Sequence, residues 1–176
     1  MEEKIQIPEG ISCMFENNVL ICKKDSLELS KKISAKGISI TVKNNTVSFQ
    51  SKKATKRERK IVHTCIKHIE NIFLGLNSKF EYNLEAANVH FPMSLKVEGD
   101  KLSISNFLGE KIPRYAKILL NVDVQIKGQK ITVSSHNKEA AGQTAANIEN
   151  STKVKNRDRR VFQDGIYITK KPGDKE

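Results

Sequence analysis

The amino-acid sequence predicts an α+β protein built as two tandem duplicated domains, each a mainly antiparallel β-sheet with one principal α-helix on one face. Three observations predict this fold: four turn pairs between β-rich runs, the recurrence of those turns at a nearly constant spacing, and helical periodicity after the second and fourth turns. The first and third turns are 82 residues apart, and the second and fourth are 84 apart. We therefore expect a first domain at residues 1–80 and a second at residues 81–176.

The predicted hairpins have two-residue turns rich in Asn and Gly, the residues that most readily adopt a positive φ. The four turns are Asn17-Asn18, Asn44-Asn45, Gly99-Asp100 and Gly128-Gln129. The flanking runs alternate apolar and polar residues, as in ISITVK at residues 38–43. A period of two predicts sheets with one face in solvent and the other covered.

The first helix is predicted by apolar residues that recur every three or four positions from Ile61 to Leu76. Thr55 followed by Glu58 is typical of a capping box at its start. Residues 80–93 form the junction, which we expect to be an extended strand leading into the second domain.

The second helix is predicted by a weaker stripe of small residues between Ala140 and Ile148. Alanines and Gly142 leave little bulk on this helix. A large partner could therefore approach its backbone closely.

The charge of the chain predicts a polyanionic partner. Lys and Arg number 31 against 20 Asp and Glu, which gives a net charge of +11 and a pI near 9.6. Residues 1–81 contribute +6 and residues 82–176 contribute +5, so the excess is spread through the folded body. This favours nucleic acid over membrane as the partner. The alternative is a charge that serves solubility alone.

Neither a secretory leader nor an apolar run near the ~18 residues of a membrane span is found, so we expect an intracellular protein. The cysteines are Cys13, Cys22 and Cys65, an odd number without a Cys-x-x-Cys pair. We expect unpaired thiols, free of metal and packed as small apolar groups, in a reducing compartment.

The sequence lacks the motifs and residue spacings that are typical of enzymes. The four histidines (His63, His68, His90 and His136) show no metal-ligand spacing with Cys, Asp or Glu. Walker, dinucleotide-binding and nucleophile-elbow motifs are absent from the sequence. We therefore expect no catalytic residue, no cofactor and no small-molecule substrate.

Two basic clusters are candidate anion sites. Residues 52–60 hold six cations and one acid at the start of the first predicted helix. Residues 153–171 hold seven cations and two acids. Either cluster could instead be a solvated charged surface, the second with incidental salt bridges to its own two aspartates.

The second cluster has an ordered pattern. Asn156 to Phe162 is predicted to form one or two helical turns, with Asn156 as the N-cap and with Val161 and Phe162 pointing inward. Gly165 is expected to adopt a positive φ in a turn, before a short strand at residues 166–169. Arginines fixed on such a platform suit phosphate, which a guanidinium grips with two hydrogen bonds.

Three motifs carry a family resemblance: NFLGEK at residues 106–111, GQTAANIE at 142–149 and VKNRDRRVFQDGIYITKK at 154–171. They resemble the large-subunit ribosomal protein six family in its archaeal and eukaryotic form, numbered nine in eukaryotes. The resemblance, which includes the duplicated architecture, runs from about residue 8 to residue 171.

The resemblance implies a structural protein of the cytoplasmic large ribosomal subunit. It implies that the second domain binds large-subunit rRNA beside the sarcin-ricin loop. The first domain would project toward the stalk base that recruits translation factors, among neighbouring ribosomal proteins. The RNA-facing candidates carried over by motif are Lys138, Gln143, Lys155, Arg157, Arg159, Arg160, Lys170 and Lys171, with Lys111 and Arg114 as weaker ones.

Two other readings stay open at this point. An RNA-processing enzyme would need a cluster of histidines and carboxylates, or a metal site. A non-ribosomal RNA- or protein-interaction module would use the sheet faces or edges.

Overall fold

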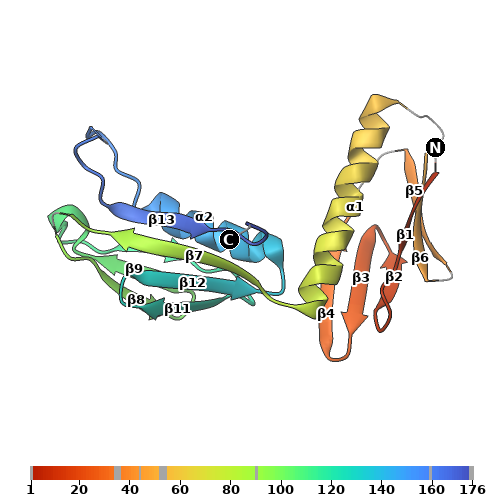
Figure 1. The fold of residues 1–176 in the computed structure, drawn as a ribbon, viewed down its shortest axis with the longest axis horizontal. Coiled ribbons are helices and arrows are strands. Elements are labelled where there is room, and N and C mark those ends of the chain that lie inside the picture. Colours follow the sequence, from red (N-terminus) through yellow and green to blue (C-terminus); the bar gives the residue numbers. More distant parts are fainter. Residues whose placement is uncertain are drawn as a thin grey trace. The chain divides into compact units, whose positions relative to one another are not determined.

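The computed structural model describes residues 2–33, 37–43, 45–51, 55–89, 91–158 and 160–174 (Figure 1). Its contacts divide the chain into two compact units, Met1–Ser78 (unit 1) and Lys79–Glu176 (unit 2). In the described part of the chain, neither helix is long and apolar enough to cross a membrane.

In its described residues, unit 1 has six strands followed by a helix. The strands form two antiparallel three-stranded sheets, in the orders β1-β6-β5 and β2-β3-β4. In chain order the elements are β1 (Glu2–Gln6), β2 (Ser12–Glu16), β3 (Val19–Lys24), β4 (Leu27–Lys32), β5 (Ile38–Lys43), β6 (Thr46–Ser51) and α1 (Lys56–Asn77).

Unit 2 repeats this order and adds one strand. Its sheets have the orders β10-β9-β8 and β11-β12-β7-β13, and every pairing is antiparallel. The elements are β7 (Phe80–Ala87), β8 (Ser94–Glu98), β9 (Lys101–Ser105), the 3₁₀ turn η1 (Phe107–Gly109), β10 (Arg114–Lys117), β11 (Asp123–Lys127), β12 (Lys130–Ser135), α2 (Lys138–Ser151) and β13 (Gly165–Lys170).

The two units share one topology. The order β5-β6-β1 in unit 1 corresponds to β11-β12-β7 in unit 2, and β2-β3-β4 corresponds to β8-β9-β10. In both, a helix follows the sixth strand. The predicted α+β class with duplicated, helix-covered sheets is confirmed, although each unit has two sheets where we expected one. The predicted junction strand is β7, which lies inside its sheet between β12 and β13.

The four predicted hairpins are formed by β2–β3, β5–β6, β8–β9 and β11–β12. Asn17 and Asn18 have φ values of 49° and 63°, as a tight turn between twisted strands requires. Gly99 and Gly128 have φ values of 59° and 62° in the corresponding turns of unit 2. Asn45 also has a positive φ, whereas Asn44 lies outside the described residues.

The core of unit 1 lies between α1 and the sheets. Five side chains of α1 are buried with Leu20, Cys22, Val47 and Phe49 of the strands; they are Val62, Cys65, Ile69, Phe73 and Leu76. Thr55 is the N-cap of α1, and its backbone N–H donates to the Glu58 carboxylate at 3.0 Å. This confirms the predicted helix start.

The core of unit 2 is covered by α2, whose small residues lie against the sheet. Ala141, Thr144, Ala145 and Ile148 are fully buried. This helix contacts strands of both sheets, β7, β12 and β13 in one and β10 in the other. The small side chains thus bring α2 close to the sheets that carry the candidate RNA contacts.

Candidate nucleic-acid interface

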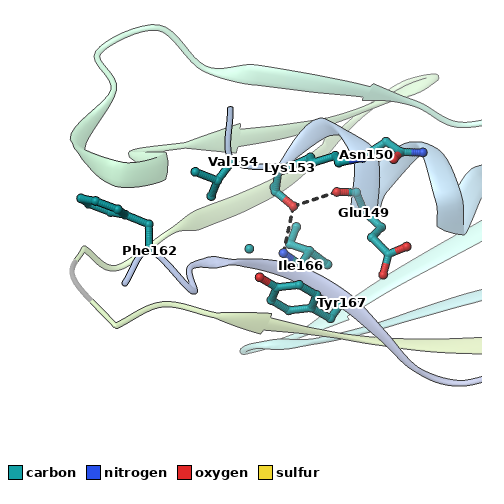
Figure 2. A pocket seen from close by; sticks show the side chains of 9 residues that line it. Glu149, Asn150, Lys153, Val154, Phe162, Ile166 and Tyr167 are labelled. Atoms are coloured by element: carbon teal, nitrogen blue, oxygen red, sulfur yellow. Dashed lines mark hydrogen bonds between the residues drawn. The ribbon is translucent and has the colours of Figure 1, made fainter. Parts of the chain in front are cut away.

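The basic segment of unit 2 is a loop that leaves α2 and returns as β13. Thr152 closes the base of this loop, because its buried hydroxyl donates to the Glu149 carbonyl (3.1 Å) and accepts from the Ile166 N–H (2.9 Å) (Figure 2). The Glu149 carboxylate also accepts the Ile168 N–H at 3.1 Å. Hydrogen bonds therefore join the C-terminal end of α2, where the loop begins, to β13, where the loop ends.

A second buried polar group fixes the point where β13 begins. Asp164 is 1% exposed, and its carboxylate accepts the Val89 N–H at 2.7 Å. A buried carboxylate needs such donors to replace the water that it loses. The loop thus returns to the sheet at a fixed residue.

The predicted positive φ at Gly165 is wrong, since Gly165 is not among the residues with positive φ. The glycine is required for space instead. A Cβ at Gly165 would lie 3.1 Å from the ring carbon and the hydroxyl oxygen of Tyr167. The Tyr167 hydroxyl donates to the Gln163 carbonyl at 3.0 Å, which holds the ring back over the glycine.

The predicted helical turns at residues 156–162 are also wrong. The described residues there form a turn in which the N–H groups of Val161 and Phe162 both donate to the Asp158 carbonyl, at 3.2 and 2.9 Å. Asn156 has a φ of 57°, whereas an N-cap is extended. Val161 is 61% exposed and does not point inward.

Phe162 anchors the loop as predicted. Its ring is partly buried and packs against the core of unit 2. Arg157 lies over this ring, with the guanidinium carbon 4.8 Å from the ring centroid. A cation in this position is attracted by the π face while its N–H groups remain available to a ligand. Arg157 is therefore an exposed cation with a fixed support.

Arg160 is held by an acid of the same turn. Its Nε and Nη2 donate to the two Asp158 carboxylate oxygens at 3.1 and 2.8 Å. These bonds lower the pKa of Asp158. Lys155 is exposed on the same loop, whereas Arg159 lies outside the described residues.

Arg114 joins this end of α2 to β10. It forms two hydrogen bonds with the Glu110 carboxylate, at 2.7 and 2.6 Å, and donates to the Ser151 carbonyl at 2.9 Å. Its guanidinium also lies 4.3 Å from the Phe107 ring centroid. The pKa of Glu110 is lowered mainly by Arg114, with a further contribution from the charge of Arg157.

Three other candidates lie toward the opposite end of α2. Lys138 is the first residue of the helix, and its ammonium is 5.6 Å from the Phe80 ring centroid. Lys170 ends β13 opposite Asn83 of β7, and Lys171 follows it. Phe80 and Asn83 belong to the first half of β7, whereas Gly165 pairs with Ala87 at its end.

The candidates therefore form two groups. The loop group is Lys111, Arg114, Lys155, Arg157 and Arg160, and the strand-end group is Lys138, Lys170 and Lys171. Gln143 lies between them, exposed on α2, and donates to the Asn147 side chain at 2.9 Å. A 14-residue helix is about 21 Å long, so the two groups are separated by roughly that distance.

A cavity of about 200 Å³ lies between the end of α2, the basic loop and the start of β13, and Figure 2 shows side chains that line it. Its lining residues are Glu149, Asn150, Thr152, Lys153, Val154, Phe162, Gly165, Ile166 and Tyr167. Sequence reasoning missed the supporting roles of Thr152, Asp164 and Glu110. No periodicity marks these residues; the position of Thr152 at the end of the predicted helix is the one signal that could have indicated any of them.

The cations at the start of α1, Lys56, Arg57, Arg59 and Lys60, are exposed, and the acid among them, Glu58, is half-buried. Residues 52–54 of that cluster lie outside the described residues. The cluster is therefore described only in part.

Comparison with known proteins identifies the family. The family model described as Ribosomal protein L6 matches residues 91–165. Three relatives, each named large ribosomal subunit protein uL6, match nearly the full length. The protein from Methanococcus vannielii is 42% identical over 98% of this chain and 95% of its own length. The protein from Methanobrevibacter smithii is 40% identical over 97% of this chain and 96% of its own length. The protein from Haloarcula marismortui is 39% identical over 96% of this chain and 95% of its own length. The chain belongs to the uL6 family, a structural, non-enzymatic family of the large ribosomal subunit, as its C-terminal motifs predict.

Proposed function

We propose that this structural ribosomal protein binds large-subunit rRNA through unit 2, beside the sarcin-ricin loop, and that unit 1 supports the factor-binding region at the stalk base. The observation that carries the RNA-binding part is the exposed Arg157, which is supported by the Phe162 ring in a loop fixed at both ends. The two ribosomal locations follow from the family resemblance.

The loop group is suited to phosphate rather than to base edges. Arginine donors in a fixed position can grip one phosphate with two hydrogen bonds. The deep major groove of A-form RNA hides its base edges from side chains, so contacts to phosphate and ribose dominate. Glu110 and Asp158 neutralise part of the charge in the free protein and orient Arg114 and Arg160.

The two groups are spaced to contact phosphates on separate stretches of one RNA. We place the loop group on one stretch and the strand-end group on another, with Gln143 facing the ribose hydroxyls between them. The side chains that α2 exposes to the RNA are polar, Glu139, Gln143 and Asn150, because its small residues are buried against the sheets.

Footprinting on purified large-subunit rRNA tests this proposal. Arg157, Arg159 and Arg160 are changed together to Gln, and the matched control changes Lys96, Lys101 and Lys127, on strands β8, β9 and β11, to Gln. If the loop group neutralises about four phosphates, it contributes about −3 to −4 to the slope of log K against log salt.

The arginine variant should flatten that slope by about two to three units and lose protection at the sarcin-ricin loop. The lysine variant should keep both. Equal protection and equal slopes for all three proteins would contradict the proposal.

A further inference from the structure

The first hairpin of unit 1 places Cys13 directly opposite Cys22. The two residues are register partners on β2 and β3, which lie side by side in Figure 1. Their Sγ atoms are 2.6 Å apart. Directly opposed residues of an antiparallel pair have Cα atoms about 4.5–5.5 Å apart, within the range that a disulfide spans. The backbone is thus already placed for a bond between these two sulfurs.

The two thiols differ in access and in acidity. Cys22 is fully buried in the core of unit 1, whereas Cys13 is half-buried. The hydrogen bond between them lowers the pKa of Cys13 and raises the pKa of Cys22. Since the thiolate is the nucleophile in disulfide exchange, Cys13 is the residue that reacts first with a reagent from solvent. Cys65 lies on α1, outside the hairpin, and burial raises its pKa.

We propose that Cys13 and Cys22 form a redox modification site, in which Cys13 is the attacking thiol and Cys22 the resolving thiol. The co-substrate is a small disulfide, such as glutathione disulfide. This site belongs to unit 1 and goes beyond the proposed RNA-binding function.

The reaction balances in two exchange steps. The Cys13 thiolate attacks one sulfur of the small disulfide, whose S–S bond breaks and releases one thiolate. Cys22 then loses its proton and attacks the Cys13 sulfur, which forms the protein disulfide and releases the second thiolate. The two cysteines lose two electrons and two protons, and the small disulfide gains them to become two thiols. Because Cys22 already touches Cys13, no reagent has to enter the core.

The test uses the reduced full-length protein incubated with glutathione disulfide and analysed by mass spectrometry. The wild type should lose two hydrogens, and proteolysis after Glu16 should leave the peptides that contain Cys13 and Cys22 joined. Cys65→Ser is the matched control and should behave as the wild type does. Cys22→Ser should stop with one glutathione on Cys13, because the resolving thiol is missing. Cys13→Ser should stay reduced.

Three results would overturn the assignment. A wild type that keeps all its thiols would show that Cys13 does not react. A stable glutathione adduct on wild-type Cys13 would show that Cys22 does not resolve it. A disulfide that includes Cys65 in the folded protein would show that the hairpin does not select the pair; in urea, where the register is lost, such products are expected.

Discussion

Arg157 lies over the face of Phe162, with its guanidinium carbon 4.8 Å from the ring centroid, so an exposed arginine of the basic loop is supported by a side chain that packs against the core. The relationship links stability to recognition. Phe162 packs against the hydrophobic cluster that α2 covers, and Arg157 is held above it. A change in the ring is therefore expected to alter both the free energy of unfolding and the affinity for rRNA.

Phe162→Ala should lower the free energy of unfolding by about 1–3 kcal/mol, less than the ~3–5 of a fully buried Phe, because the ring is only partly buried. It should also weaken rRNA binding, since Arg157 loses its support. Phe162→Leu is the control, which keeps apolar bulk but no π face. In chemical denaturation, the free energy of unfolding of Phe162→Leu should be close to that of the wild type. The affinity for rRNA should be reduced in both the Ala and the Leu variant. Wild-type affinity in the Ala variant would contradict the role of the ring.

Gly165→Ala should destabilise unit 2 by about 1–3 kcal/mol, because the new methyl group would meet the Tyr167 ring at 3.1 Å. A double-mutant cycle separates this cause from backbone strain. In a Tyr167→Ala background the same Gly165→Ala change should cost much less. An equal cost in both backgrounds, measured by thermal or denaturant unfolding, would show that the ring is not the obstacle.

Thr152→Val should lower the free energy of unfolding by about 1–3 kcal/mol, because it leaves the buried Ile166 N–H without an acceptor. Valine has nearly the same volume as threonine, so the change removes the hydroxyl without leaving a cavity. Thr152→Ser keeps the hydroxyl and should retain most of the stability. Hydrogen exchange gives a local measurement: the Ile166 amide should exchange faster in the Val variant than in the Ser variant. Unchanged protection in the Val variant would mean that the hydroxyl does not close the loop.

The Glu110–Arg114 pair predicts a loss of stability in acid. Arg114 lowers the pKa of Glu110 below its ordinary value of 4.5, so the folded protein favours the ionised carboxylate. The stabilisation that the ion pair contributes is complete above pH 4.5 and is lost as the pH falls through the folded-state pKa of Glu110. The melting temperature of Glu110→Gln should be lower than that of wild type near pH 6, and the difference should shrink below pH 4. A constant difference between pH 3 and pH 6 would contradict this linkage.

The sequence predicted best where a local signal decides the structure. The Asn17-Asn18 turn has a strong preference for positive φ, and it fixes the register of β2 and β3. That register also places Cys13, four residues before the turn, opposite Cys22, four residues after it. That these two residues face each other was therefore open to prediction, and all three cysteines are free, as expected.

Prediction failed where tertiary contacts decide. Asn156 to Phe162 has the composition of a short capped helix, but Phe162 packs into the core and Asp158 bonds Arg160 instead. The Asp-Gly pair suggested a positive φ, whereas Asp164 is bonded to Val89 of a distant segment and Gly165 makes room for Tyr167. Neither contact has a signal in the local sequence.

The separation of the RNA-facing candidates into two groups gives the last prediction. Lys138, Lys170 and Lys171 changed together to Gln should flatten the salt dependence of rRNA binding by about two to three units, since each phosphate contact contributes about 0.7–0.9 to the slope. The groups are about 21 Å apart along the 14-residue α2, so their effects should add when the strand-end variant is combined with Arg157→Gln. Hydroxyl-radical footprints should lose protection at different nucleotides in the two variants. If the strand-end variant keeps the wild-type slope and footprint, the RNA contacts the loop group alone, and the interface covers only the C-terminal end of α2.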